Sequence, residues 1–195
     1  AVQVDHLRNC EWMQHGQRQD LAVLYLHAIN PYGFSWLRRV NEDNIDLNRN
    51  FIDFNQPLPD NPDYRALAPL LVPRRQPPTL LSTLSLAGYA LRHGTKALQS
   101  AITRGQHSHP EGLFYAGAAP AWSNLQLRQI IRRLGNHCRR IGWIDVHTGL
   151  GPCGVGERIY KGLNHPNDIA RARSWWGAQV TASADGTSSS AMLNG

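Results

Sequence analysis

The spacing of apolar side chains at three and four residues predicts helices along much of the chain. The predicted helical segments are 4–15, 64–71, 79–103 with an interruption near His93 and Gly94, 123–135, and 167–180. Ser123 or Asn124 is expected to cap the helix at 123–135, and Gly135 is expected to end it.

Two short runs are apolar without helical periodicity, at 21–29 and 141–146. Runs of this kind are typical of strands buried on both faces of a mostly parallel sheet. Pro31 and Gly33 end the first run. The second run ends with Asp145 and His147 and is followed by a glycine-containing loop. Strand runs separated by helices favour a layered α/β domain with a mostly parallel or mixed sheet, in which ligands bind beyond the carboxyl ends of the strands.

The segment 34–61 between these elements is polar and has no regular period. Its interleaved aromatic and leucine side chains predict an ordered loop. Ordered loops of this length in a compact domain usually carry function.

Composition narrows the class of protein. A chain of 195 residues with 42% hydrophobic residues is expected to form a single domain over 1–195. It has no apolar run long enough for a membrane helix and no export signal, and its three cysteines form no CxxC pair, so a cytoplasmic location is expected. The formal charge of +6 comes from scattered arginine pairs without interleaved aromatics, which favours helix surfaces over a nucleic-acid interface.

The polar loop contains groups suited to binding a carboxylate. Asn48 and Arg49 are adjacent, and Arg39 precedes them. A guanidinium presents a planar donor fork that matches a carboxylate, and a neighbouring amide adds a donor. Because Arg38 and Arg39 are adjacent, only one can point into a site if the backbone there is extended. The alternative is that these polar side chains only satisfy the loop backbone.

Two motifs resemble the M14 family of zinc carboxypeptidases: the turn at 30–34 followed by the string at 46–51, and Asp145 and His147 at the end of an apolar run. The resemblance implies that Asn48 and Arg49 clamp a substrate carboxylate, that Arg39 polarises the scissile carbonyl, and that His147 is a zinc ligand. Asp145, on the same face of a strand, is a possible partner of that histidine.

A larger set of phrases is similar to the DUF2817 subgroup of M14-like proteins. They are 27–34, 38–54, 110–117, 122–124 and 145–158. The resemblance implies a three-layer carboxypeptidase-like (phosphorylase/hydrolase-like) α/β fold and zinc as cofactor. It also implies a peptide or acyl-amino-acid substrate with a free carboxylate.

The sequence departs from the M14 pattern at the metal site. It has no His-x-x-Glu, the segment that supplies the first two zinc ligands, and no glutamate follows Glu157 to act as the general base. A catalytic zinc needs three protein ligands. We therefore expect a domain that is incomplete at both ends and inactive by itself. A carboxylate-binding module that has lost its metal site is the alternative.

Overall fold

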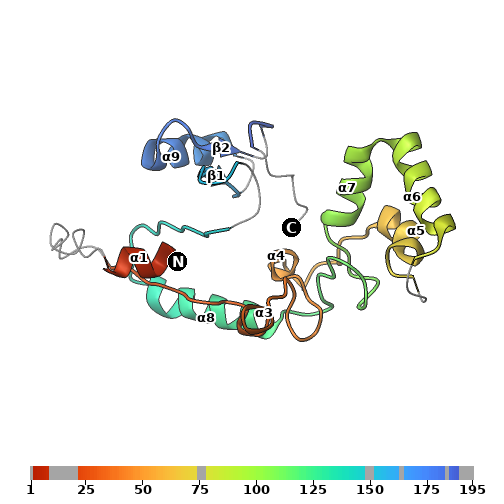
Figure 1. The fold of residues 1–195 in the computed structure, drawn as a ribbon. Helices are drawn as coiled ribbons and strands as arrows, with labels where there is room; N and C mark the ends of the chain where they lie inside the picture. The colour runs from red at the N-terminus through yellow and green to blue at the C-terminus, as the bar shows by residue number, and fades with distance from the viewer. Residues whose placement is uncertain are drawn as a thin grey trace.

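The structure is a computed structural model that describes residues 2–8, 22–73, 78–147, 152–162, 165–182 and 185–188. Its elements (Figure 1) are α1 (Val2–Arg8), α3 (Pro31–Trp36), α4 (Leu47–Asn50), α5 (Pro62–Leu71), α6 (Leu80–His93), α7 (Thr95–Thr103), α8 (Trp122–Gly135), β1 (Ile159–Tyr160), α9 (Pro166–Trp176) and β2 (Thr181–Ala182). None of the helices in these ranges combines the length and the apolar character needed to cross a membrane.

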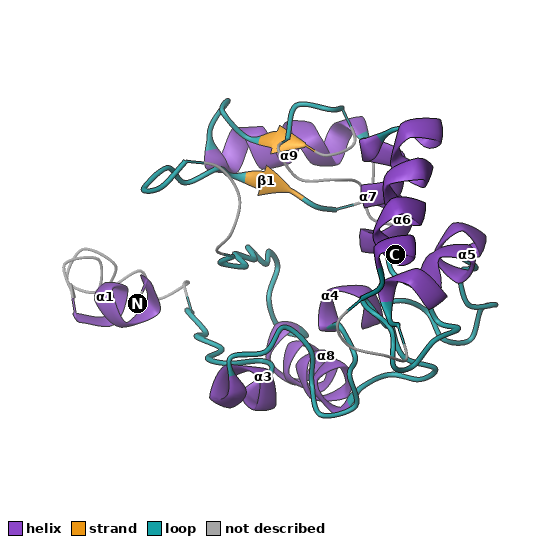
Figure 2. Ribbon diagram, turned by 45° about the vertical axis from the view of Figure 1, so that its right-hand side comes forward, coloured by secondary structure: helices purple, strands orange, loops and turns teal. Residues whose placement is uncertain are grey.

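The helices α5, α6 and α7 pack against one another and form a group at one side of the structure (Figure 2). Asn61 caps α5 by accepting a hydrogen bond from the Tyr64 amide at 3.0 Å. Gly94 separates α6 from α7 with a φ of 90°, which glycine adopts without steric cost. The predicted helices at 64–71 and 79–103, with their interruption, are therefore confirmed.

The helix α8 contacts α4 (Figure 1) and confirms the helix predicted at 123–135. The predicted cap is wrong, because the N-cap residue is Ala121 and no side chain caps the helix. Asn124 instead donates to the carbonyl oxygen of Asn50 at 2.6 Å, so its amide group serves the neighbouring loop rather than its own helix.

The strands β1 and β2 pair in parallel, with Ile159 opposite Thr181, and α9 forms the crossover between them. The helix predicted at 167–180 is present as α9, but it ends at Trp176, before the predicted end. Gly177 follows it with a φ of 99°, a left-handed conformation that commonly ends a helix.

The strands predicted at 21–29 and 141–146 are not formed in the residues that the structure describes, where β1 and β2 make the one sheet. Val23 is 46% exposed and Ile144 is 70% exposed, whereas a strand at the centre of a sheet would bury both. An apolar pattern does not supply the neighbouring backbone that a strand needs for its ladder of hydrogen bonds. The three-layer α/β fold therefore stays a prediction.

Two predictions extend beyond the described ranges. The helix predicted at 4–15 overlaps α1, and its residues 9–15 lie outside the described residues. The glycine-containing loop predicted after His147 begins with Thr148 and Gly149, which also lie outside them.

A cluster of buried polar side chains, which we call the polar hub, surrounds α4. Its members are Asn41, Asp46, Arg49, Asn50, Asn61, Gln106 and Asn124. A small apolar core lies beside it, formed by Ile45, Leu47, Tyr115 and Ala121. The hub stabilises the long polar segment predicted at 34–61, because its amide side chains form hydrogen bonds with loop backbone groups that have no partner in a helix or sheet.

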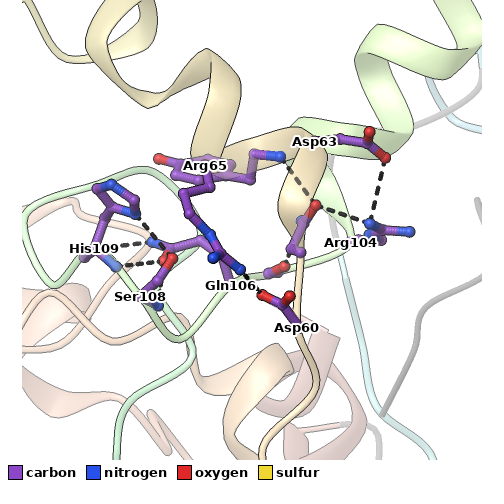
Figure 3. A network of polar contacts seen from close by, with 10 residues as sticks. Asp60, Asp63, Arg65, Arg104, Gln106, Ser108 and His109 are labelled. Carbon is purple, nitrogen blue, oxygen red and sulfur yellow. Dashed lines mark hydrogen bonds and ion pairs between the residues drawn. The ribbon is translucent and has the colours of Figure 1, made fainter.

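The hub reaches α5 and α7 through Asn61, whose Oδ1 accepts from the Tyr64 amide and whose Nδ2 donates to the Ala101 carbonyl oxygen at 3.0 Å. The side-chain oxygen Oε1 of Gln106 accepts hydrogen bonds from the backbone amides of Ser108 and His109, at 2.9 and 2.7 Å (Figure 3). Arg104 donates to Asn61 Oδ1 at 2.8 Å. These bonds hold the chain that follows α7 against the start of α5.

Candidate functional site

The short helix α4 directs three successive side chains to three different places. Asp46 begins the helix, and its Oδ1 accepts a hydrogen bond from the Asn48 amide at 3.1 Å. Asn48 is exposed, whereas Arg49 and Asn50 are buried. One turn of helix therefore carries a solvent-facing amide, an internal cation and an internal amide.

Asn50 links this turn to α8. Its Nδ2 donates to the carbonyl oxygens of Ala116 and Ala119, at 2.8 and 3.0 Å, and its Oδ1 accepts from the Ala121 amide at 2.8 Å. Asn124 Nδ2 donates to the Asn50 carbonyl oxygen. Asn50 is completely buried, so each of these bonds replaces one that water would otherwise make.

Arg39 lies beside Asp46, and Asp46 holds it in place. Arg39 Nε donates to Asp46 Oδ2 at 2.8 Å, and the Arg39 side chain is 55% exposed while that of Asp46 is 3% exposed. No described residue accepts a hydrogen bond from the terminal nitrogens of Arg39. Asn30, which caps α3, donates through Nδ2 to the Arg39 carbonyl oxygen at 3.3 Å. Arg39 is therefore anchored at one edge and has its terminal nitrogens available for a ligand.

Arg49 points into the protein. Its Nε donates to the Thr103 carbonyl oxygen at 2.8 Å, Nη2 donates to the same oxygen, and Nη1 donates to the Asn48 carbonyl oxygen at 3.3 Å. Gly105 makes room for the side chain, because an added Cβ would lie 2.9 Å from Arg49 Cδ. Burial lowers the pKa of Arg49 and the charge of Arg39 lowers it further, while the Asp46 carboxylate opposes both.

The two arginines share an aromatic neighbour. The guanidinium carbon of Arg39 lies 5.1 Å from the centroid of the Phe114 ring, and that of Arg49 lies 5.5 Å from it. A ring face attracts cations, so Phe114 stabilises two like charges that would repel each other in its absence.

His147 and Asp145 meet at the far end of the second apolar run. His147 Nε2 lies 2.9 Å from Asp145 Oδ2, and the two side chains are 59% and 60% exposed. The segment 141–147 forms no helix or strand, so this pair is a direct contact between two side chains that are two positions apart. When Nε2 carries the proton shared with Asp145, Nδ1 is the nitrogen with a free lone pair.

A cleft of about 620 Å³ brings these groups together. Its polar lining consists of Asn30, Arg39, Asp46, Asn48, Arg128, Asp145 and His147, and its apolar lining of Ile29, Leu47, Phe51, Leu127, Ile131, Trp143 and Val146. Of the predicted site residues, the structure thus gathers Arg39, Asn48 and His147 around one space. It places Arg49 behind the wall of that space, and Arg38 does not line it.

Arg128 and Trp143 line the cleft and were not predicted as site residues. A signal for Arg128 exists in the sequence, since Asn124 and Arg128 are four residues apart on a helix and so share a face with Leu127 and Ile131. Nothing in the sequence links that face to the loop at 34–61, because the link runs through the buried amide of Asn50.

The donors in the cleft do not complete a zinc site. Within the described ranges, no three His, Cys, Asp or Glu side chains cluster so that they could hold a metal ion. Zinc takes three protein ligands in catalytic sites, and His147 with Asp145 offers two donors at most. The described residues therefore do not fit a bound zinc by themselves.

Residues 1–195 match the sequence model of a family described as "Protein of unknown function (DUF2817)". No curated protein matches the chain. No solved structure matches it either.

Proposed function

Because the chain belongs to the DUF2817 family and carries the cleft described above, we propose that it forms the substrate-carboxylate side of a zinc-dependent, carboxypeptidase-like hydrolase. Such an enzyme cleaves a peptide or amide bond next to a free carboxylate, and its substrate is a peptide or an acyl-amino acid. A three-layer α/β fold belongs to the same proposal, with the apolar runs at 21–29 and 141–146 as strands of its sheet. Cys138 and Cys153 are free and exposed, which suits a reducing compartment such as the cytoplasm.

The observation that carries the proposal is the gathering of Arg39, Asn48 and His147 around one cleft. His147 lies about a hundred positions after Asn48 in the sequence, and each of the three was singled out by its resemblance to a residue that acts in the M14 site. A cleft with a cation and an amide on one wall and an imidazole on the other suits a substrate whose carboxylate and scissile bond are close neighbours.

Carboxylate recognition follows from the chemistry of the first wall. The terminal nitrogens of Arg39 form a planar fork, and a carboxylate accepts two parallel hydrogen bonds from such a fork. The exposed carboxamide of Asn48 adds a donor from the first turn of α4. Asp46 contributes indirectly, since it orients Arg39 through Nε and Asn48 through the backbone amide.

Arg49 supports this wall from behind. Its hydrogen bond to the Asn48 carbonyl oxygen and its bonds to Thr103 tie α4 to the end of α7. The clamp role that the M14 resemblance implies for Arg49 would require its side chain to leave the Thr103 carbonyl. In the arrangement seen here, Arg39 and Asn48 are the groups that reach a carboxylate.

Bond cleavage requires a water that a metal or a base activates. The described donors do not complete a zinc site, so the residues seen here bind and orient a substrate, and we expect no hydrolysis from this chain alone. The same observation favours a second function, that of a carboxylate-binding module without catalysis.

Binding of a carboxylate tests the shared part of both functions. The probe is N-acetyl-alanyl-alanine, compared with its carboxyl-terminal amide, and the signal is the heat of binding in titration calorimetry. We expect the acid to bind at least about tenfold more tightly than the amide, the worth of one charge-assisted pair. Arg39→Gln should remove most of that preference, and Arg38→Gln, next to it but outside the cleft, should keep it. Equal binding of acid and amide would reject both functions.

Zinc content separates the two functions. The test uses a longer protein in which the natural sequence on both sides of this chain is included. After dialysis against zinc and removal of the excess, the hydrolase predicts about one zinc per molecule of that protein, lost in His147→Ala, because a catalytic zinc depends on each of its ligands. His137→Ala changes an exposed histidine outside the cleft and serves as the control. A longer protein that binds the acid but holds no zinc in any variant is a binding module.

A further inference from the structure

The helix α8 contributes a second cation to the cleft. Arg128 lines the same space as Arg39, on the face of α8 that also presents Leu127 and Ile131. The wall around it is otherwise apolar, with Phe51 beneath its guanidinium at 6.0 Å from ring centroid to Cζ.

Hydrogen bonds fix the direction of Arg128. Its Nε donates to Asn124 Oδ1 at 2.6 Å, and Nη2 donates to the Ile52 carbonyl oxygen at 3.3 Å. Asn124 is in turn bound to Asn50, on the helix that presents Asn48. The hydrogen bonds from Arg128 to Asn124 and from Asn124 to Asn50 therefore fix the position of Arg128 relative to α4, the helix that carries Asn48.

The residues that line the cleft offer Arg128 no ion pair. Outside the cleft, hydrogen bonds from Asn55 and, to a smaller extent, the charge of Arg128 lower the pKa of Asp53. Asp46 pairs with Arg39, and Asp145 pairs with His147. The ion pairs of the described residues include none with Arg128, and no described residue accepts a hydrogen bond from its Nη1. The side chain is exposed, so a ligand can reach it.

We infer that Arg128 recognises a second anionic group of the substrate, so that the favoured substrate is a peptide or acyl-amino acid whose terminal residue has an acidic side chain. The inference rests on the proposed function, because it takes the carboxylate at Arg39 and Asn48 as given. It makes Arg128 a specificity-determining residue: one anionic group lies at Arg39, and the second lies at Arg128 on α8.

The experiment compares two probes of nearly the same shape, N-acetyl-alanyl-glutamate and N-acetyl-alanyl-glutamine. Both carry the terminal carboxylate, and only the first carries the second charge. We expect the unsubstituted chain to bind the glutamate peptide about tenfold more tightly, the worth of one charge-assisted hydrogen-bonded pair. In Arg128→Gln the ratio of the two affinities should fall to about one, because the residue at position 128 then has no positive charge to attract the glutamate side chain of the peptide.

Arg132→Gln is the matched control. It removes an exposed arginine one turn further along α8, outside the cleft, and should leave the ratio unchanged. Arg128→Lys should retain part of the ratio, since it keeps the charge and loses the fork. The helical signal in circular dichroism checks that each variant folds, and the ratio in the unsubstituted chain tests the inference without any variant.

The outcomes separate the inference from its premise. If both peptides bind and their affinities are equal, Arg128 has no role in selectivity and the carboxylate site stands. If neither peptide binds, the proposed function fails and the inference fails with it. A ratio that persists in Arg128→Gln would assign the selectivity to another residue and would overturn the inference.

Discussion

The two walls of the cleft are built in different ways. The wall that carries Arg39 and Asn48 belongs to the polar hub, where buried amides and a buried carboxylate bind specific backbone groups. The wall that carries Trp143 and His147 is extended chain, with apolar side chains at large exposure and one close polar pair. The first wall is thus fixed by contacts within the described chain, and the second is not.

The difference shows what holds a loop in place. Apolar side chains hold a segment only when another surface covers them, and the run at 141–146 has no such cover in the described residues. Buried amides hold a loop by satisfying its backbone, and they cost free energy when a partner is lost. Substitutions in the hub should therefore change stability, while those in the extended wall should not.

The largest expected effect is that of Asn50→Ala. The change leaves two carbonyl oxygens and the Ala121 amide without their partner, and should lower the free energy of unfolding by about 3 kcal/mol. Asn48→Ala on the same helix removes an exposed side chain and should cost less than about 0.5 kcal/mol. Urea unfolding followed by circular dichroism measures both. Similar costs at the two positions would mean that the hub does not hold this wall.

Arg49→Met should have the next largest effect. Methionine keeps much of the buried stem but leaves the Thr103 carbonyl oxygen unpaired, so the free energy of unfolding should fall by about 1–2 kcal/mol. The comparison variant is Arg38→Met, which changes an exposed arginine outside the cleft. If the two variants unfold at the same urea concentration, Arg49 is not a structural residue.

Tyr64 differs from the side chains of the polar hub, which are hydrogen-bonded, because its hydroxyl is buried without a hydrogen-bond partner among the described residues. Burial raises the pKa of Tyr64, so the unfolded chain loses its phenolic proton at a lower pH than the folded chain does. Stability should therefore be unaffected by this group below pH of about 10 and should decline above it. The decline in the free energy of unfolding should be shallower in Tyr64→Phe.

Part of the decline should remain in Tyr64→Phe, since burial also raises the pKa of Tyr160. Urea unfolding at several values of pH between about 9 and 11 gives the slopes. A steeper slope in Tyr64→Phe than in the unsubstituted chain would contradict the assignment.

The smallest effect is expected in the extended wall. Ile144 is 70% exposed, so Ile144→Asn should change the free energy of unfolding by less than about 0.5 kcal/mol. Leu67→Asn, at a position only 2% exposed, places a polar group in the interior and should cost about 3 kcal/mol. A large cost at Ile144 would show that this wall is covered, and would remove the contrast between the two walls.

The sequence predicts the features that depend on neighbours along the chain. Helix periodicity and the break at Gly94 are local, and the helices at 64–71, 79–103 and 123–135 are confirmed. The strands at 21–29 and 141–146 are not found in the described residues, because pairing depends on a second segment that the pattern does not identify.

The same distinction applies to the site. Local motifs single out Arg39, Asn48 and His147, which the structure gathers at one cleft. The direction of Arg49 depends on a carbonyl oxygen 54 positions away, and no local motif encodes it. Arg128 reaches the cleft through a contact between Asn124 and Asn50, 74 positions apart, which the sequence pattern does not predict.

The amide side chain of Asn50 has a consequence for the rate at which backbone protons exchange with solvent. The Ala121 amide lies at the start of a helix, where the first amides ordinarily have no helical partner and exchange quickly. Here Asn50 Oδ1 accepts its proton inside the protein. In deuterated water, the Ala121 amide should therefore exchange as slowly as amides in the middle of α8, and only when the hub itself opens.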